Sequence, residues 1–406
     1  MTTKLLLGLL ACTLIGVIFI GCKEDAPASL FDPNYVSGPQ PKVTSVEPAT
    51  NALAGVTTLT INGANFSATS ANNLVFFDQT LVPVLQASTT QLQVKAPNLP
   101  KDSIKVKVAV FKSDLYSDAV LYKLNLAADE KFGSFGTSEE PVAVECDTAG
   151  NAYVSMLSSG LGIGIKKFTP AGVRSDYSPA FSGAVASWRG MKFGPGGAMY
   201  AVAGRSIIFR VPPGGGASAI WLSGGGLSSL NDLDFDATGN IWTGGPSAVS
   251  VFRVKQDKTV QAFPFTGTVR AVRVYNGYLY VGGKRDSLEK VWRFPIDGTG
   301  SLGAEEEYFN LSSLYGANSS GVTALTFASD GDLLVGTDGP AGIIVVHPNK
   351  SYAPMYPGII IGQTASLSWG RGFDLFQSRV GTPGPKTIVK INTLKTGAPY
   401  YGRTLP

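Results

Sequence analysis

Residues 232–243 read DLDFDATGNIWT, and variants of this pattern return along the last two-thirds of the chain. The related stretches are AVECDTAGNAYV (143–154), GMKFGPGGAMYA (190–201), AVRVYNGYLYV (271–281), ALTFASDGDLLV (324–335) and SLSWGRGFDLFQ (366–377). Each has two strand-like runs separated by a turn rich in Gly, Asp or Asn, and a third run follows. Six copies of roughly 40 residues, each forming four short strands, predict a six-bladed β-propeller. We expect residues 398–402 to supply the outer strand of the sixth blade.

The repeats align two positions on the strand expected nearest the propeller axis. The first position is small in most copies, because inner strands crowd together, but it is Asp232 in the third copy. A carboxylate in a narrow channel is costly unless it is solvated, paired or metal-bound, so Asp232 is a functional candidate. The alternative is a hydrated Asp232 in a water-filled channel.

The second aligned position alternates in charge over four consecutive copies. Its residues are Glu145, Lys192, Asp234 and Arg273. Opposite charges at one height favour ion pairs between neighbouring blades. We therefore predict that these four side chains fix the order of the blades and have a structural role.

One face of the propeller should gather the loops that precede the inner strands. These loops carry Trp188, Arg189, Asn231 and Arg270, next to Asp232. A basic, partly aromatic rim suits an anionic group, and Trp188 is expected to stack on a sugar ring. These five residues form the predicted ligand-binding site. The alternative is that the charges only keep the loops soluble.

Composition excludes several kinds of site. The chain has one histidine, His347, which excludes a multi-histidine zinc site, and it has no basic run suited to nucleic acid. Asn231 and Asp232 alone fall short of the about six to eight oxygen ligands that calcium takes. We predict no catalytic residues, no metal site and no cofactor, with calcium left open. Cys146 is predicted to be a small buried hydrophobe.

Residues 41–125 precede the repeats and show short alternating runs with turn residues about every ten positions. This pattern predicts an immunoglobulin-like sandwich. The order of its motifs resembles the IPT/TIG family, and the motifs are SVEP (45–48), Gly55, LTINGANF (59–66), VFF (75–77), TQLQVKAP (90–97) and Tyr122. The resemblance implies a spacer or a protein-contact module. Gly63 and Asn65 are expected to adopt the left-handed backbone of a tight turn.

Two turns of the repeats carry a second resemblance. DTAGN (147–151) and DATGN (236–240) resemble the turns of NHL-type six-bladed propellers. The resemblance implies the same propeller architecture for residues 130–406.

The N-terminus carries a targeting signal. An apolar run at 5–21 follows Lys4, which is typical of a secretory leader, and FIGC (19–22) resembles a bacterial lipobox. The resemblance implies that Cys22 receives lipid and becomes the mature N-terminus. The alternative is an uncleaved anchor helix.

Residues 22–40 contain three prolines and little periodicity, so they are predicted to be an extended tether. The residues KED (23–25) resemble the signal that sends lipoproteins to the outer face of the outer membrane. We expect an outer-membrane lipoprotein of the cell envelope that faces outward.

The predicted segments are a signal peptide at 1–21, a tether at 22–40, an IPT/TIG domain at 41–125 and a propeller at 130–406. The predicted function is non-enzymatic: the sandwich is a spacer, and the propeller loop face binds a glycan, neutral or anionic, or an envelope protein. The alternative is a propeller enzyme, such as a calcium-dependent lactonase or a polysaccharide lyase. A third hypothesis is a structural component of an envelope complex, which would require a large apolar patch.

Overall fold

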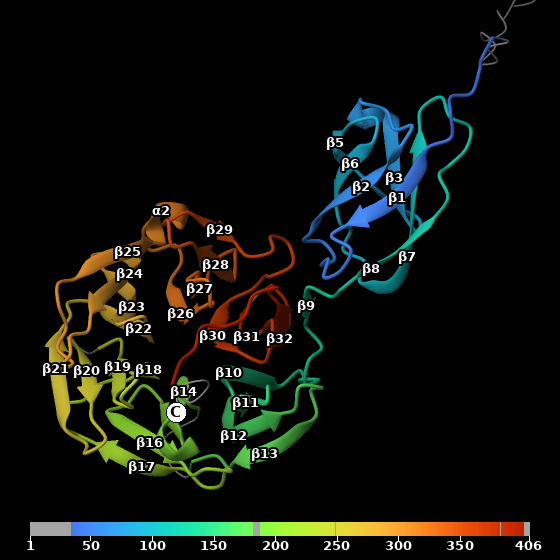
Figure 1. Cartoon of the computed structure of the whole chain (residues 1–406). Helices are drawn as coiled ribbons and strands as arrows, with labels where there is room; N and C mark the ends of the chain where they lie inside the picture. Colours follow the sequence, from blue (N-terminus) through green and yellow to red (C-terminus); the bar gives the residue numbers. More distant parts are fainter. Residues whose placement is uncertain (1–33, 182–186, 248, 382, 402–406) are drawn as a thin grey trace, which may run out of the picture.

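The computed structural model describes residues 34–181, 187–247, 249–381 and 383–401. It contains two β-rich parts, a small sandwich that follows the N-terminal segment and a ring of sheets (Figure 1). The predicted leader, Cys22 and most of the predicted tether lie outside the described residues. Among the residues that are described, no helix is long and apolar enough to cross a membrane.

Two four-stranded sheets form the sandwich. In sheet order, the first has β1 (Lys42–Glu47), β2 (Thr58–Ala64), β6 (Gln91–Lys95) and β5 (Val84–Ala87), and the second has β4 (Thr80–Val82), β3 (Asn73–Phe77), β7 (Lys101–Val110) and β8 (Val120–Leu124). Alternate residues point inward, as in β3, where Val75 and Phe77 are buried and Leu74 is exposed. The inward side chains of both sheets form one core, so the alternation in the sequence explains why the sheets pack face to face.

The end of β2 required two special residues, for different reasons. Asn65 has a φ of +61°, which is the left-handed conformation that the sequence predicted. The prediction was wrong for Gly63, which is not left-handed. A Cβ at Gly63 would lie 1.9 Å from the carbonyl oxygen of Lys42, so glycine is needed because β1 approaches so closely.

Six further four-stranded sheets stand around one axis and confirm the predicted propeller (Figure 1). Blades 1 to 3 are β10 (Glu139–Cys146), β11 (Ala152–Ser158), β12 (Leu161–Phe168), β13 (Arg174–Ser178); β14 (Gly190–Phe193), β15 (Met199–Val202), β16 (Ile207–Val211), β17 (Ala219–Ser223); and β18 (Asp232–Phe235), β19 (Ile241–Gly244), β20 (Ser250–Val254), β21 (Val260–Pro264). Blades 4 to 6 are β22 (Thr268–Tyr275), β23 (Tyr278–Arg285), β24 (Leu288–Pro295), β25 (Glu306–Asn310); β26 (Val322–Phe327), β27 (Leu333–Thr337), β28 (Ile343–Val346), β29 (Tyr352–Pro354); and β30 (Thr364–Trp369), β31 (Asp374–Arg379), β32 (Thr387–Asn392), β9 (Ala128–Asp129). The short helix α2 (Ser312–Tyr315) follows β25.

Strand register explains why the repeats carry an aromatic residue and a cation at matching positions. In blade 1 Tyr153 of β11 pairs with Lys167 of β12, and the Lys167 Nζ lies 5.7 Å from the centre of the tyrosine ring. In blade 3 Trp242 of β19 pairs with Arg253 of β20 at 5.9 Å. These cross-strand contacts between a cation and a ring help to hold the second and third strands together.

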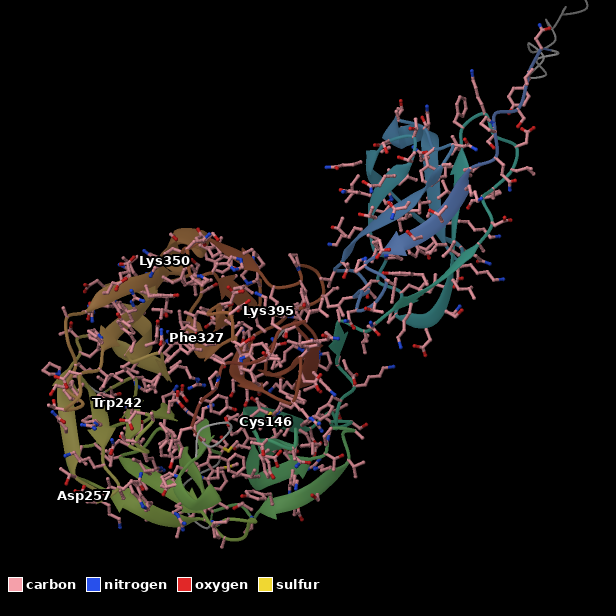
Figure 2. The ribbon with its side chains drawn as sticks, in the orientation of Figure 1. Cys146, Trp242, Asp257, Phe327, Lys350 and Lys395 are labelled. Atoms are coloured by element: carbon pink, nitrogen blue, oxygen red, sulfur yellow. The ribbon has the colours of Figure 1, made fainter. Side chains whose placement is uncertain are left out.

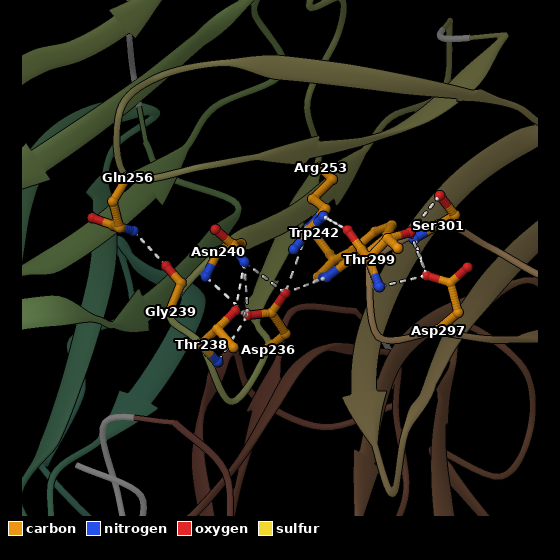
Figure 3. Close-up of polar contacts among 10 residues, drawn as sticks. All are labelled: Asp236, Thr238, Gly239, Asn240, Trp242, Arg253, Gln256, Asp297, Thr299 and Ser301. Atoms are coloured by element: carbon orange, nitrogen blue, oxygen red, sulfur yellow. Dashed lines mark hydrogen bonds and ion pairs between the residues drawn. The ribbon is translucent and has the colours of Figure 1, made fainter.

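The turn 236–240 of blade 3 is organised by one carboxylate (Figure 3). Asp236 Oδ1 accepts hydrogen bonds from the backbone N–H groups of Thr238 and Asn240, and Oδ2 accepts one from Trp242 Nε1 at 3.1 Å. The turn therefore anchors the large Trp242 side chain. Trp242 and Cys146 are both buried inside the propeller, in different blades (Figure 2). Burial of Cys146 among apolar neighbours confirms its predicted role as a small hydrophobe.

The ring is closed from its N-terminal side. The outer strand of blade 6 is β9, which pairs with β32 through Asp129 and Lys390 and through Ala128 and Ile391. The expectation that residues 398–402 supply this strand was therefore wrong, and the propeller begins before the predicted residue 130. Because β8 ends at Leu124, only three residues separate the sandwich from the propeller.

Residues 398–401 instead cross the axis at the end of the ring where the inner strands finish. Tyr400 Oη donates a hydrogen bond to Glu145 Oε1 at 3.1 Å, and Lys192 Nζ lies 4.8 Å from the centre of the Tyr400 ring. Tyr401 stacks on Phe235 of blade 3. Among the described residues, this C-terminal segment lies across that end of the axis and lines a cavity of about 20 Å³ together with the inner strands.

Candidate functional site

A pocket of about 490 Å³ opens at the opposite end of the propeller axis. Its wall is built by all six blades, from the residues just before or at the start of each inner strand: Val142, Arg189, Asn231, Arg270, Thr323 and Gln363. Small inner-strand residues such as Ala324 and Ser366 leave room at the centre. We call this cavity the axial pocket. It combines apolar side chains with amide, hydroxyl and guanidinium groups, as small-molecule sites commonly do.

Arg270 lies between two carboxylates at the wall of the axial pocket. Its Nη2 donates to Glu289 Oε1 at 2.9 Å, and its Nη1 lies 3.9 Å from Asp338 Oδ2. Glu289 is buried, and burial raises its pKa while Arg270 opposes that rise. Glu289 Oε2 also accepts the backbone N–H of Val322 in the next blade. A buried carboxylate thus holds the guanidinium in one position, with about a third of the Arg270 side chain still exposed.

Arg189 lies across the axial pocket on blade 2. Its Nη1 is 3.4 Å from Asn231 Oδ1, and Asn231 in turn donates through Nδ2 to the carbonyl oxygen of Arg270 at 2.6 Å. Asn231 therefore links the two arginines. Within the described part of the chain Arg189 has no carboxylate partner, so its charge is available to a ligand.

Asp232 and Arg273 form the deeper wall of the axial pocket between blades 3 and 4. Asp232 Oδ2 accepts from Arg273 Nη1 at 2.8 Å and from the backbone N–H of Val272 at 3.0 Å. Burial opposes the charge of Arg273, but Asp232, Asp234 and Glu145 outweigh burial and raise its pKa. Asp232 thus lines the pocket as a structural clamp between two blades, and its carboxylate is already occupied by those donors.

Of the four alternating charges, Arg273 lines the axial pocket, whereas Lys192 and Asp234 line the small cavity at the other end of the axis and Glu145 is fully buried. Lys192 Nζ of blade 2 is 2.7 Å from Glu145 Oε2 of blade 1, and both side chains are buried. Arg273 of blade 4 reaches Asp232 rather than Asp234, although both carboxylates belong to blade 3. Asp234 Oδ2 accepts the backbone N–H of Val274.

The buried charges leave one carboxylate in excess. Glu145, Asp232 and Asp234 face two cations, Lys192 and Arg273, which are paired with Glu145 and Asp232. Burial raises the pKa of Asp234, and the charges of Arg273 and Lys192 oppose this rise. A proton on Asp234 leaves this cluster without net charge.

The expected role of Trp188 was wrong. The side chain is only 1 % exposed and packs edge-on against Phe209 in the core of blade 2, so it cannot stack on a sugar in the axial pocket. Its neighbour Arg189 points the other way because successive residues of an extended chain face opposite sides. The predicted rim keeps Arg189, Asn231, Asp232 and Arg270, which all line the axial pocket.

Sequence reasoning missed Glu289 as the residue that orients Arg270. Glu289 lies on the third strand of blade 4, and nothing in the repeats shows that its side chain turns back toward the axis. Sequence reasoning also missed Gln363, which adds an amide to the wall. The acidic residue within the otherwise apolar and basic run LEKVWRF (288–294) is the one available signal.

The axial pocket does not suit a metal cation. Asn231 and Asp232, the two residues considered for calcium, already bind Arg189, the Arg270 carbonyl, Val272 and Arg273. Three guanidinium groups beside them would repel a divalent ion. In the described ranges, no three His, Cys, Asp or Glu residues are grouped closely enough to hold a metal.

Residues 41–124 match the IPT/TIG domain family, in agreement with the resemblance in the sequence. No curated protein matches the chain. An auxiliary nutrient binding protein from Bacteroides thetaiotaomicron VPI-5482 has 11% sequence identity and a TM-score of 0.53, over 89% of this chain and 98% of its own. A provisionally assigned phosphatase from the same organism has 10% identity and a TM-score of 0.56, over 89% and 98%. At such identities, these likenesses show a shared fold.

Proposed function

We propose that this protein binds an acidic glycan in the axial pocket, without turnover, as an outward-facing lipoprotein of the outer membrane. The observation that carries the proposal is the pair Arg189 and Arg270, which border one cavity and are joined through Asn231. Guanidinium groups bind carboxylates and sulfates through paired N–H donors.

The rest of the axial pocket is consistent with a sugar. Asn231 and Gln363 supply amides, and Thr323 and Ser366 supply hydroxyl groups. Val269 is among the apolar residues that line the pocket. A volume of about 490 Å³ suits one to a few sugar residues. The architecture shared with a protein described as an auxiliary nutrient binding protein also favours a role in uptake.

The proposed cellular location rests on the N-terminal residues. The apolar run at 5–21, the FIGC motif and the KED residues favour lipidation at Cys22 and export to the cell surface. An acidic glycan is a ligand that such a protein would meet there. The sandwich then spaces the propeller from the tether.

The test is calorimetric titration of the chain from Lys23 to Pro406 with uronate-containing or sulfated oligosaccharides and with neutral oligosaccharides of matched size. Losing one charged hydrogen-bond donor costs about 1.5–3 kcal/mol, so Arg270→Ala and Arg189→Ala should each weaken acidic-glycan binding about ten- to hundredfold. Arg174→Ala is the matched control. The Arg174 side chain lies on the outer strand β13, is about as exposed as that of Arg270, and pairs with Glu139.

Equal binding of neutral and acidic glycans would contradict an arginine-based site. Binding that survives both pocket substitutions would place the glycan elsewhere on the molecule. Absence of binding across the panel would contradict the glycan itself and direct the search to a protein partner by cross-linking at the cell surface.

A further inference from the structure

One end of the sandwich carries a group of exposed apolar side chains on two adjacent segments. Residues 35–40 and the loop 111–116 lie side by side there: Gly38 N–H donates to the Lys112 carbonyl at 2.6 Å, and Gln40 Nε2 donates to the Tyr116 carbonyl at 2.7 Å. We call these two segments the distal tip. Their exposed apolar side chains are Tyr35, Val36, Phe111, Leu115 and Tyr116.

Most of these apolar side chains are more than half exposed to solvent. Val36 is 83 %, Phe111 68 % and Leu115 60 % exposed. The other exposed large apolar side chains of the sandwich strands are Leu74, Leu81, Leu85 and Leu121, which lie one on each of four strands, whereas the distal tip gathers five on two adjacent segments. A group of exposed apolar residues on one loop and its neighbour marks an interaction surface.

The segments of the distal tip are held in place. Tyr35 Oη donates to Asp114 Oδ1 at 2.9 Å, the Asp114 N–H donates to Ser37 Oγ at 3.1 Å, and the Phe111 N–H donates to the Asn72 carbonyl at 2.8 Å. Tyr116 also packs edge-on against Phe76 of β3. The apolar side chains are thus presented by an ordered backbone.

The position of the distal tip indicates what covers it. β7 runs away from the propeller and ends at Val110, so the loop 111–116 lies at the end of the sandwich where the N-terminal segment arrives (Figure 1). Only 11 residues (23–33) separate Asn34 from Cys22, and a fully extended chain of that length spans at most about 40 Å. With Cys22 lipidated, the distal tip is held close to the bilayer at a high effective concentration.

We propose that the distal tip is a membrane-contacting surface that inserts Phe111, Leu115 and Val36 into the lipid headgroup region. Aromatic and aliphatic side chains are favoured at this interface, and an added contact orients a protein that a single lipid anchor leaves free to turn. Lys112 and Asp114 offset each other in charge, so the contact is apolar and does not require anionic lipid. The proposal rests on the predicted lipid anchor and is independent of the axial pocket.

The test places a fluorescent reporter at the distal tip of the full lipidated chain. All five native tryptophans lie in the propeller, so Phe111→Trp adds the only tryptophan of the sandwich. Leu121→Trp is the matched control, because Leu121 is 64 % exposed on β8, away from the loop 111–116. Both variants are reconstituted in vesicles of phosphatidylethanolamine and phosphatidylglycerol, with and without brominated lipid.

We expect the Phe111→Trp emission to shift to the blue and to be quenched by brominated lipid, with no quenching at Leu121→Trp. Vesicles of phosphatidylcholine alone should give the same quenching. Flotation of the protein with vesicles but no quenching at either position would overturn the proposal and assign the distal tip to a protein partner. Failure of the full chain to float with vesicles would overturn the proposal together with the predicted anchor.

Discussion

Single buried charges decide how the blades of this propeller meet. Glu145 and Lys192 join blades 1 and 2, and Asp232 and Arg273 join blades 3 and 4. Removal of one member of a buried ion pair leaves the other charge without compensation, and this costs far more than loss of a surface pair.

Lys192→Met should lower the free energy of unfolding by about 3–5 kcal/mol, because Glu145 stays buried without its cation. The double variant Glu145→Gln with Lys192→Met should recover much of this loss. Urea unfolding measures both. Lys290→Met, which breaks a more exposed pair with Glu307, is the control and should cost less than about 1 kcal/mol. A double variant as unstable as Lys192→Met would contradict this account of the pair.

Asp234 should give the protein a distinctive pH dependence. Burial raises its pKa above the value of about 4 in the unfolded chain, so between these two pKa values the folded protein binds more protons than the unfolded chain does. This contribution to stability is present at low pH and is lost as the pH rises toward the folded pKa. Asp234→Asn removes that loss, so the melting temperature of the variant relative to wild type should be higher at pH 7 than at pH 4. A difference that is constant with pH, or reversed, would show that Asp234 is ionised in the folded protein.

At the scale of the single element, the glycine-rich turns that predicted the repeats also help to stabilise the blades. Asp236 in the turn 236–240 binds Trp242 as well as the turn backbone, whereas Asp297 in the similar turn 297–301 accepts hydrogen bonds only from exposed neighbours (Figure 3). The two turns are alike in sequence but differ in what they anchor.

Asp236→Ala should therefore destabilise the propeller by about 2–4 kcal/mol, since it leaves the buried Trp242 N–H and two turn N–H groups without acceptors. Asp297→Ala should have little effect. Thermal unfolding, followed by the near-ultraviolet circular dichroism of the tryptophans, separates the two. Equal effects of the two substitutions would mean that burial of Trp242 does not add to the role of the carboxylate.

How far the sequence predicts this structure depends on the element. Strands with alternating residues and glycine-rich turns were predicted well, because their pattern reflects burial on one face. β9 has only two paired residues, too few for any periodicity, so its place in blade 6 was missed. In the axial pocket, Arg189, Asn231 and Arg270 were found from their position before the inner strands. The direction of Trp188 was predicted wrongly and the role of Glu289 was missed, because side-chain direction depends on packing between blades.

At the scale of the whole molecule, β9 ties the two ends of the propeller together. Its pairing with β32 is reinforced by Glu130, whose carboxylate lies 2.6 Å from the buried Arg379 guanidinium. A form that begins at Lys131 should be less stable by about 3–5 kcal/mol than one that begins at Leu126, because it loses the pairing and leaves Arg379 without its partner. Chemical unfolding of the two forms gives the comparison. Equal stability would show that the ring does not depend on this strand.

The C-terminal segment makes the two ends of the propeller axis different. Residues 398–401 lie across one end, and the axial pocket opens at the other. A polymer cannot thread through such a cavity, so whatever enters must leave by the same opening. If the ligand is the glycan proposed above, a long chain can therefore be recognised only by its terminal units or by a side branch. The number of chain ends, rather than the total mass of polysaccharide, would then set how many copies of the protein one polymer can occupy.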